Sequence, residues 1–348
     1  MRGVLFRADA SPEIGTGHVM RCLALAQVFL QAQKQVLFLA AAISPALVER
    51  LQQEGIRVLR ISAHSGSPED ARLLTDNAKA ADICHVVVDG YQFDETYQTA
   101  LKSAGLKVLF IDDYGHAATY SADWVLNQNV YAHDQLYSQR KPHTKLLLGS
   151  RYALLRKEFW PWRGWPRLPT APAQKVLVTL GGGDPDNVTL KVLLALQQVK
   201  SELDVIIIVG SSNPHLEILQ QQNQSTSQFI RLRHNVTDMP ALMAWADIAI
   251  SAGGSTCWEL AFMGLPTLMI VVADNQKRIV ESLDTLGVGI SLGWHDALTP
   301  AQIKQALESL LNTTQLRLRM MQSGRSLIDG IGSHRVANQL GLDVPPSR

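Results

Sequence analysis

The chain has 348 residues, which is enough for two domains of ordinary size. Hydrophobic residues make up 46% and charged residues 18%, proportions that exclude a disordered, collagen-like or coiled-coil chain. The 32 Lys and Arg residues nearly balance the 31 Asp and Glu residues, so the charge predicts no nucleic-acid partner and no membrane partner. Three cysteines without a CxxC motif and an N-terminus without an apolar core lead us to expect a cytoplasmic protein.

The first half of the chain alternates short, apolar, β-rich runs with stretches of helical periodicity. The predicted strands are Val4–Phe6, Val36–Leu39, Val58–Ile61, His85–Val88 and Val108–Ile111. The predicted helices are His18–Gln33, Pro45–Glu54, Pro68–Ala80 and Glu95–Ala104. This alternation is typical of βαβ units, which build a parallel sheet with helices on both faces.

Between residues 157 and 174 the composition changes, because the segment KEFWPWRGWPRLPTAPAQ contains four prolines and three tryptophans. The composition predicts a stiff linker rather than a regular element. The alternation then resumes, with predicted strands at Lys175–Leu180, Val205–Val209, Phe229–Leu232, Ile248–Ser251, Thr267–Val271 and Val288–Ile290.

The pattern predicts the α/β class, with two Rossmann-like domains that face one another across a cleft. We expect an N-terminal domain at 1–156, a linker at 157–174 and a C-terminal domain at 175–348, whose last helices pack back on the first domain. Ligands of such sheets bind at the carboxyl ends of the strands, and two facing domains bind them in the cleft.

The first glycine-rich turn, ADASPEIGTGH, joins a strand to a helix at residues 8–18. Gly15 and Gly17 form either a tight turn or a surface where substrate approaches the backbone. The spacing matches neither GxGxxG nor the P-loop motif. His18 opens the helix, whose positive end disfavours a charged imidazolium, so His18 is a candidate general base. The other loop histidines, among them His116, are expected in solvent.

The second turn, LGGGDPDN at residues 180–187, follows a strand directly, and its Gly182 and Gly183 could approach a phosphate. Asp184 and Asp186 formally match a DxD metal motif. We favour helix initiation instead, with Asp184 as the N-cap and Pro185 as the first helical residue.

The third turn, ISAGGSTCWE at residues 250–259, supplies small and hydroxyl residues before a helix, which suits an anion. The candidate anion-binding residues are Ser251, Gly253, Gly254, Ser255 and Thr256. Glu259 lies one turn further on, where it could bind the ribose hydroxyls or simply interact with the helix dipole. Cys257 is read as a buried thiol rather than a nucleophile, since no histidine is obviously paired with it.

Several longer segments carry a family resemblance. They are FRADASPEIGTGHVMRCLALA, VVVDGYQFDETY, LFIDDYGH, WVLNQN and LLGSRYALLRKEF in the first half, then VLVTLGGGDPDN and ADIAISAGGSTCWELAFMGLPTLMIVVADNQ. Through these motifs, which occur along the whole chain, it resembles the UDP-2,4-diacetamido-2,4,6-trideoxy-β-L-altropyranose hydrolases of pseudaminic acid biosynthesis. Some relatives carry a fused acetyltransferase domain, whereas this sequence ends soon after the second predicted α/β unit.

The resemblance implies a GT-B fold and inverting cleavage at the anomeric carbon, with water as acceptor. Because backbone donors and a helix dipole can stabilise the departing UDP, we expect the reaction to need no metal. We also expect no cofactor, a UDP-sugar as the bound partner, and a monomer. His18 matches the catalytic histidine of the family. Tyr91, Asn275 and Gln276 match positions near the sugar, and the turn with Glu259 matches the UDP-binding region.

Two other functions fit the same residues. One is a GT-B glycosyltransferase of an envelope or spore-coat polysaccharide, and the other is a non-catalytic nucleotide-sugar binding protein. If His18 is not the base, the next candidate is a carboxylate such as Asp9, acting on a water held by Tyr91 and Asn275.

Overall fold

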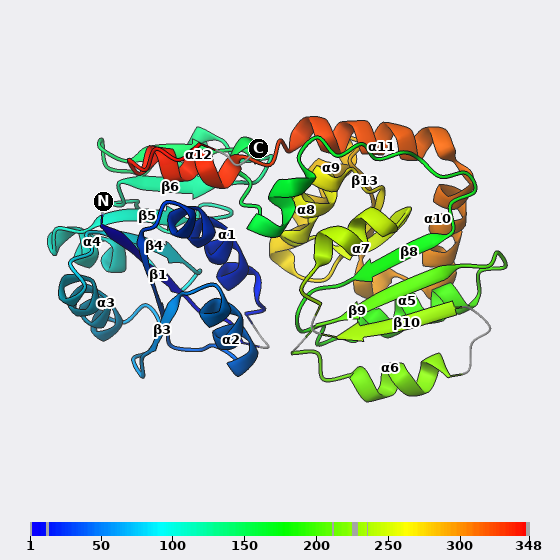
Figure 1. The fold of residues 1–348 in the computed structure, drawn as a ribbon, viewed down its shortest axis with the longest axis horizontal. Coiled ribbons are helices and arrows are strands. Elements are labelled where there is room, and N and C mark those ends of the chain that lie inside the picture. The colour runs from blue at the N-terminus through cyan, green and yellow to red at the C-terminus, as the bar shows by residue number, and fades with distance from the viewer. Residues whose placement is uncertain (1, 12–13, 211, 225–228, 235, 346–348) are drawn as a thin grey trace. The chain divides into compact units, whose positions relative to one another are not determined.

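The computed structural model describes residues 2–11, 14–210, 212–224, 229–234 and 236–345. The chain forms two compact units (Figure 1). The first contains residues 1–160 and 330–348, and the second contains residues 161–329. No helix in the described ranges is long and apolar enough to cross a membrane.

The first unit is built on a 7-stranded parallel sheet in the order β3-β2-β1-β4-β5-β6-β7. Its strands are β1 (Gly3–Ala8), β2 (Gln35–Ala40), β3 (Arg57–Arg60), β4 (His85–Asp89), β5 (Lys107–Ile111), β6 (Trp124–Asn127) and β7 (Lys145–Leu148). All five predicted strands are present. The strands β6 and β7 were not among the predictions, because each has only four residues and polar loops surround them.

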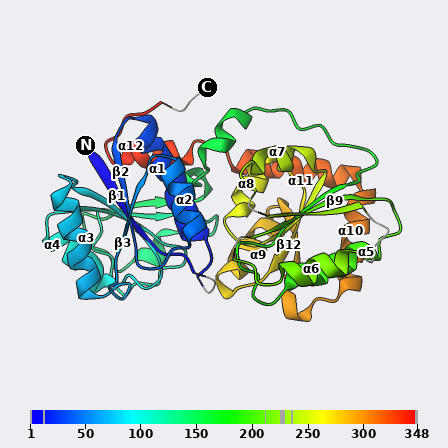
Figure 2. The same ribbon diagram turned by 60° about the horizontal axis from the view of Figure 1, so that its bottom comes forward.

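Helices cover both faces of this sheet, as Figure 2 shows. They are α1 (Gly17–Gln31), α2 (Pro45–Gln53), α3 (Pro68–Ala80), α4 (Glu95–Ser103) and α12 (Gly332–Gln339), with short 3-10 helices η1 (Asp134–Tyr137) and η2 (Ser150–Tyr152). Alternate strand residues point to opposite faces. Phe6 and Phe38 therefore pack in the core with α1, α2 and α12, whereas Leu5 and Leu37 pack in the core with α3 and α4.

The second unit has a 6-stranded parallel sheet in the order β10-β9-β8-β11-β12-β13. Its strands are β8 (Lys175–Thr179), β9 (Asp204–Val209), β10 (Phe229–His234), β11 (Ile248–Ala252), β12 (Thr267–Val271) and β13 (Gly289–Trp294). Its helices are α5 (Val188–Gln197), α6 (Leu216–Asn223), α7 (Met239–Trp245), α8 (Thr256–Met263), α9 (Lys277–Thr285), α10 (Pro300–Asn312) and α11 (Thr314–Leu327), with η4 (Asp274–Gln276) and η5 (His295–Ala297).

Each sheet contains one point where the strand order reverses, between β1 and β4 in the first unit and between β8 and β11 in the second. Loops leave the two strands of such a pair in opposite directions, which opens a crevice at their carboxyl ends. Two of the glycine-rich turns follow β8 and β11, and the turn with His18 follows β1. The fold thus brings the three glycine-rich turns to the strands at which the order reverses.

The proline-rich segment begins with a 3-10 helix, η3 (Lys157–Trp162), which contains Pro161. Beyond it, the chain is fastened to the second unit by Arg167, whose buried guanidinium donates to the carbonyls of Met263 and Ala246 at 2.8 and 2.7 Å. Arg317 donates to the carbonyl of Thr170 at 2.7 Å. The part of the predicted linker around Arg167 and Thr170 therefore packs against the second unit.

Candidate active site

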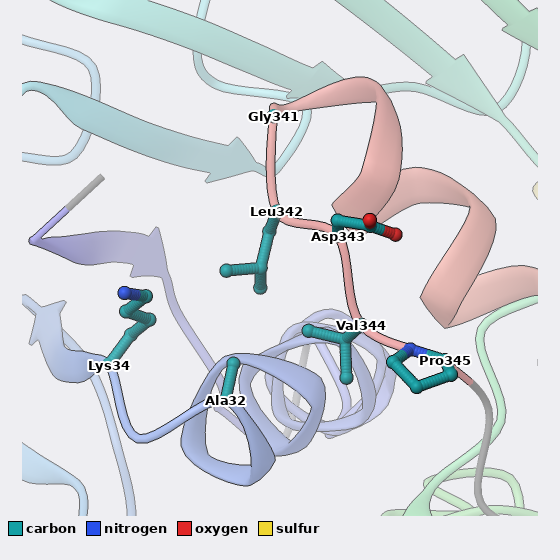
Figure 3. Close-up of a pocket in the computed structure, with 7 residues that line it drawn as sticks. All are labelled: Ala32, Lys34, Gly341, Leu342, Asp343, Val344 and Pro345. Atoms are coloured by element: carbon teal, nitrogen blue, oxygen red, sulfur yellow. The ribbon is translucent and has the colours of Figure 1, made fainter.

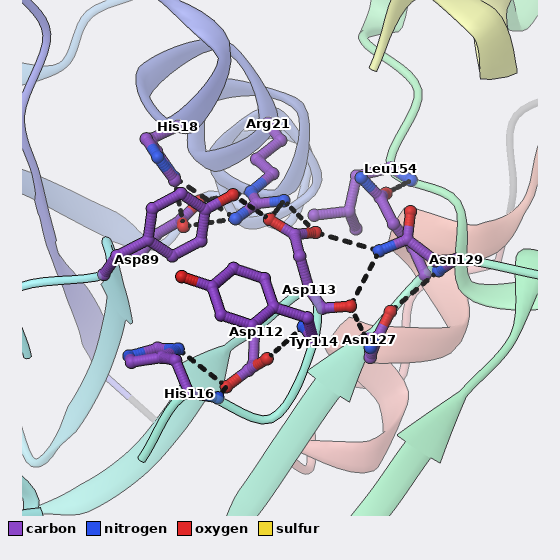
Figure 4. A network of polar contacts seen from close by, with 12 residues as sticks. His18, Arg21, Asp89, Asp112, Asp113, Tyr114, His116, Asn127, Asn129 and Leu154 are labelled. Atoms are coloured by element: carbon purple, nitrogen blue, oxygen red, sulfur yellow. Dashed lines mark hydrogen bonds and ion pairs between the residues drawn. The ribbon is translucent and has the colours of Figure 1, made fainter. Parts of the chain in front are cut away.

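A buried polar network lies at the carboxyl end of the first sheet (Figure 4). His18 opens α1, and its Nδ1 atom lies 2.7 Å from Oδ1 of Asp89, the last residue of β4. Asp89 is fully buried and His18 is 8% exposed. Arg21, one turn further along α1, donates to both Asp89 oxygens at 2.5 and 2.6 Å.

These contacts fix the proton on the imidazole ring. Burial alone would raise the pKa of Asp89, but Arg21 and His18 outweigh it and hold the pKa below its ordinary value. An ionised carboxylate only accepts hydrogen bonds, so Nδ1 of His18 must carry the proton that it shares with Asp89. The Nε2 atom then holds the lone pair, and no hydrogen bond among the described residues occupies it.

Arg21 also links His18 to a second carboxylate. Its NH1 group donates to both oxygens of Asp113 at 2.8 and 3.0 Å. Asp113 in turn accepts from the hydroxyl of Tyr91 at 2.7 Å, and the Tyr91 ring meets the His18 ring edge-on with centroids 5.0 Å apart. His18, the predicted base, and Tyr91, one of the residues predicted near the sugar, are therefore held by one buried ion network.

Next to it, Asp112 organises the loop after β5. Its carboxylate accepts from the backbone amides of Tyr114 and Gly115, both at 2.7 Å. His116 places Nδ1 2.9 Å from Asp112 and Nε2 3.2 Å from the carbonyl of Phe93. Burial would lower the pKa of His116, but Asp112 outweighs it and raises the pKa. The expectation that His116 lies in solvent is wrong, because its ring is largely buried between two acceptors.

Asp9, the alternative candidate for the base, has its carboxylate bound by other residues of the first unit. Its oxygens accept from the amides of Ala41 and Ala42 at 2.7 and 3.0 Å and from the Ser65 hydroxyl at 2.7 Å. Arg7 lies 2.8 Å from the same carboxylate, outweighs the effect of burial and lowers its pKa. Asp9 therefore fastens loops and is poorly suited to accept a proton.

Gly15 lies in the turn that leads to His18, with φ at +77°, a conformation that favours glycine. Its amide donates to the carbonyl of Ser11 at 2.8 Å, which closes the turn. Gly17 is the first residue of α1, and Thr16 at the N-cap makes no side-chain cap. Pro12 and Glu13 of this motif lie outside the described residues.

In the second unit, helix α8 also begins without a side-chain cap at its N-cap residue, Ser255. By contrast, serine or aspartate caps the helices that follow β2, β3 and β4. The described hydrogen bonds leave the amides of Gly254, Ser255 and Thr256 unused. A Cβ atom on Gly254 would meet nothing within 4 Å. Amides at an uncapped helix start with open space before them can receive an anion.

Other predicted residues around this turn have local structural contacts. The Gly253 amide donates to the carbonyl of Ile270 at 3.2 Å and to Oε1 of Gln276 at 3.1 Å. Gln276 Oε1 also accepts from the amide of Val272, so this side chain braces the turn. Ser251 is fully buried and donates to the carbonyl of Ala252. Gly254, Ser255 and Thr256 therefore remain the best placed of the predicted anion-binding residues.

The remaining candidates, Asn275, Glu259 and Cys257, lie in the second unit. Asn275 lies in η4 and Glu259 in the first turn of α8, both in the second unit. Cys257 is buried, and burial together with Glu259 raises its pKa to about 12. It is therefore a thiol at neutral pH, in line with the structural role predicted for it.

The turn after β8 departs from the prediction at its helix start. Helix α5 begins at Val188, so Pro185 is not helical. Asp184 is not the N-cap residue, but its carboxylate reaches forward to the amides of Val188 and Thr189 at 2.8 and 2.9 Å. Gly182 and Gly183 precede it in the loop after β8, where the Gly182 carbonyl accepts from the amide of Ser212, after β9, at 3.1 Å.

A surface pocket of about 440 Å³ lies elsewhere, at the opposite end of the first sheet (Figure 3). Ala32 and Lys34 line it where α1 passes into β2, together with residues 341–345 of the C-terminal segment. None of the predicted site residues lines it, so the polar network rather than this pocket defines the candidate site.

Residues 176–330 match the model of the glycosyltransferase family 28 C-terminal domain. The chain is 26% identical to the spore coat polysaccharide biosynthesis protein SpsG of Bacillus subtilis, over 94% of this chain and 95% of that protein. It is 27% identical to the UDP-2,4-diacetamido-2,4,6-trideoxy-beta-L-altropyranose hydrolase of Campylobacter jejuni, over 67% of this chain and 76% of that protein.

Solved structures share the fold. MurG of Acinetobacter baumannii superposes with a TM-score of 0.65 at 17% identity, over 98% of this chain and 99% of that one. The S. aureus MnaA–UDP structure gives 0.66 at 12% identity, over 100% and 99%. The predicted GT-B fold of two Rossmann-like domains is confirmed.

The sequence prediction missed the three charged partners of His18 and Tyr91, which are Arg21, Asp89 and Asp113. A signal for them exists. Asp89 and Asp113 each follow a buried strand, in VVVDG and FIDDYG, and Arg21 lies three residues after His18 on the same helix face.

Proposed function

We propose that the protein hydrolyses UDP-2,4-diacetamido-2,4,6-trideoxy-β-L-altropyranose to UDP and the free sugar, with inversion at the anomeric carbon. The observation that carries the proposal is the contact of His18 Nδ1 with buried Asp89 at 2.7 Å, which leaves the basic Nε2 atom unoccupied by the described residues. The similarity to the Campylobacter jejuni hydrolase supports the choice of substrate.

In this reaction Nε2 of His18 takes a proton from a water molecule as the water oxygen bonds to the anomeric carbon. The bond between that carbon and the β-phosphate oxygen breaks, and its electron pair leaves with UDP. Asp89 holds the ring orientation and stabilises the imidazolium that forms, as a carboxylate partner of a catalytic histidine does. Attack on the face opposite UDP inverts the anomeric carbon.

The departing diphosphate needs its negative charge stabilised. The amides at the start of α8 and the positive end of its dipole supply donors for this purpose. To Glu259, in the first turn of the same helix, we assign the role of accepting from the ribose hydroxyls. Asp184 uses its oxygens on helix α5. We therefore propose a reaction that proceeds without a divalent cation.

A glycosyltransferase of an envelope or spore-coat polysaccharide is the second candidate. The match of residues 176–330 to the glycosyltransferase family 28 C-terminal domain favours transfer, and the similarity to the spore coat polysaccharide biosynthesis protein SpsG favours such a polysaccharide. In a transferase the same Nε2 atom would take the proton from a sugar hydroxyl rather than from water. A non-catalytic nucleotide-sugar binding protein is the third candidate, and the intact His18–Asp89 pair argues against it.

Incubation of the pure protein with the UDP-sugar, without acceptor, separates the three. We expect UDP release at a steady rate, persistence of that rate in EDTA, and the inverted anomer as the first product in NMR spectra. Release only after an acceptor sugar is added would identify a transferase. Binding of the UDP-sugar with no release under either condition would identify a binding protein.

A further inference from the structure

We propose that Arg21 and Asp113 act as a buried charge pair that sets how readily His18 takes up a proton, with Arg21 lowering and Asp113 raising its proton affinity. The inference rests on the proposed function, because it assigns a purpose to the environment of the base. Both residues are positioning residues, since they reach the reacting atoms only through His18, Asp89 and Tyr91.

The geometry places the Arg21 charge directly beside the imidazole. The NH2 group of Arg21 lies 3.2 Å from His18 Nδ1, and it donates to Asp89 Oδ1 at 2.6 Å. Since Nδ1 already donates to Asp89, it cannot also accept from Arg21. The contact therefore sets two positive groups side by side whenever His18 is protonated, which opposes protonation.

Asp89 and Asp113 oppose this effect. Arg21 binds Asp89 through two nitrogens and Asp113 through NH1, so one cation serves two carboxylates. Burial alone would raise the pKa of Asp113, but Arg21 and Tyr91 outweigh it and hold the pKa well below its ordinary value. Around His18, two negative charges thus face one positive charge within a water-poor site, where charges act strongly.

The groups that face His18 come from each element around it. Asp89 ends β4, Arg21 and the thiol of Cys22 come from α1, Asp113 follows β5, and the Tyr91 ring follows β4. The Cys22 thiol has its pKa raised by burial and by Asp89, so it stays neutral. Among the residues that the structure describes, Arg21 and Asp113 are therefore the charges, besides Asp89, that these contacts link to His18.

The test measures His18 directly by NMR titration of the histidine side chains in the full-length protein, with its signal assigned by its absence in His18→Asn. Asp113→Asn keeps the side-chain shape and removes one negative charge, so the titration midpoint should fall by about one pH unit. Arg21→Gln should raise it by a similar amount. Arg21→Lys keeps the charge and should leave it in place.

Asp123→Asn is the matched control, because Asp123 pairs with Lys102 and takes no part in the network. It should not move the midpoint. Shifts of Asp113→Asn and Arg21→Gln in the same direction, or no shift in folded Asp113→Asn, would overturn the inference. The titration does not depend on enzymatic activity, so it can be measured even if the protein releases no UDP. Where UDP is released, the acid limb of the pH–rate profile should move with the midpoint.

Discussion

His18 is the residue at which a strand end, a helix start and a buried carboxylate meet. Asp89 fixes the tautomer of its ring, and Arg21 lies 3.2 Å from the same ring nitrogen. A general base must be neutral before the reaction and must hold a proton during it, so both contacts bear on the role that we propose for His18.

The first prediction concerns this residue. His18→Asn should lower kcat by roughly 100- to 10,000-fold, the usual contribution of a general base. KM and the affinity for UDP should change little, since the lost interaction belongs to the transition state. Steady-state UDP release, with UDP titrated by calorimetry, gives both quantities. A variant that folds and keeps near-normal kcat would place the base elsewhere.

The second prediction concerns Glu259. Glu259→Ala should weaken UDP binding about tenfold, which corresponds to the loss of one ribose hydrogen bond of ~1.4 kcal/mol. Glu308→Ala on α10 is the control, because Glu308 pairs with Lys304, one turn earlier on the same helix. Binding calorimetry with UDP and with UMP measures the effect. Unchanged affinity in folded Glu259→Ala would leave Glu259 as a first-turn acid only.

At the scale of elements, two adjacent glycines before α8, Gly253 and Gly254, have different surroundings. A Cβ atom on Gly253 would come 2.3 Å from Cγ2 of buried Val280 and 3.0 Å from Cβ of Gln276. On Gly254 it would meet nothing within 4 Å. The first glycine therefore permits close packing, and the second leaves room beside the unused amides.

This difference gives the third prediction. Gly253→Ala should destabilise the second unit by about 1–3 kcal/mol, the usual result of overpacking. Gly254→Ala should leave stability nearly unchanged but weaken UDP binding about tenfold, because a methyl group would keep phosphate from the backbone. Urea unfolding and UDP titration of both variants provide the comparison. Equal UDP affinity in Gly254→Ala and the unaltered protein would remove the diphosphate from this helix start.

Much of the element pattern could be predicted from the sequence. The helix at Pro68–Ala80 is found with its predicted bounds, because Ser67 caps its start and proline occupies the first position. The strand Thr267–Val271 likewise has its predicted bounds. Buried runs and cap residues are local signals, so a single sequence carries them.

The partners of the site could not be found in this way. Asp89, Asp113 and Arg21 are 24 to 92 positions apart, and their contacts depend on strand order, which periodicity does not reveal. The start of α5 was also predicted wrongly, because its cap does not have the usual spacing from the helix. Asp184 caps that helix from four residues before its first residue, through a left-handed backbone at Asn187.

At the scale of the whole molecule, the chain leaves the first unit at residue 160 and returns to it at residue 330. Helix α12 packs on α1 and η2, and the ring of its His334 lies 4.8 Å from that of Trp160. Gly332 begins the helix so close to the Ala153 carbonyl that a Cβ atom would lie 2.2 Å away. The first unit is therefore built from both ends of the sequence.

The last prediction tests whether the returning helix α12 stabilises the first unit. Val336 on α12 is fully buried in the core shared with β1, β2 and α1, and Gln339 on the same helix is exposed. Val336→Ala should destabilise the first unit by roughly 2 kcal/mol, through lost burial and the cavity left behind. Gln339→Ala should change little, since exposed substitutions rarely exceed ~0.5 kcal/mol.

Hydrogen exchange read by mass spectrometry distinguishes the two units. In Val336→Ala, amides of β1 and β4 should exchange faster, because they open with the unit that α12 completes, whereas amides of β8 and β11 should keep their protection. Faster exchange confined to β8 and β11 would mean that the C-terminal helix stabilises the second unit instead. The His18–Asp89 pair joins α1 to β4, so the same variant should also lower kcat if the returning helix holds α1 in place.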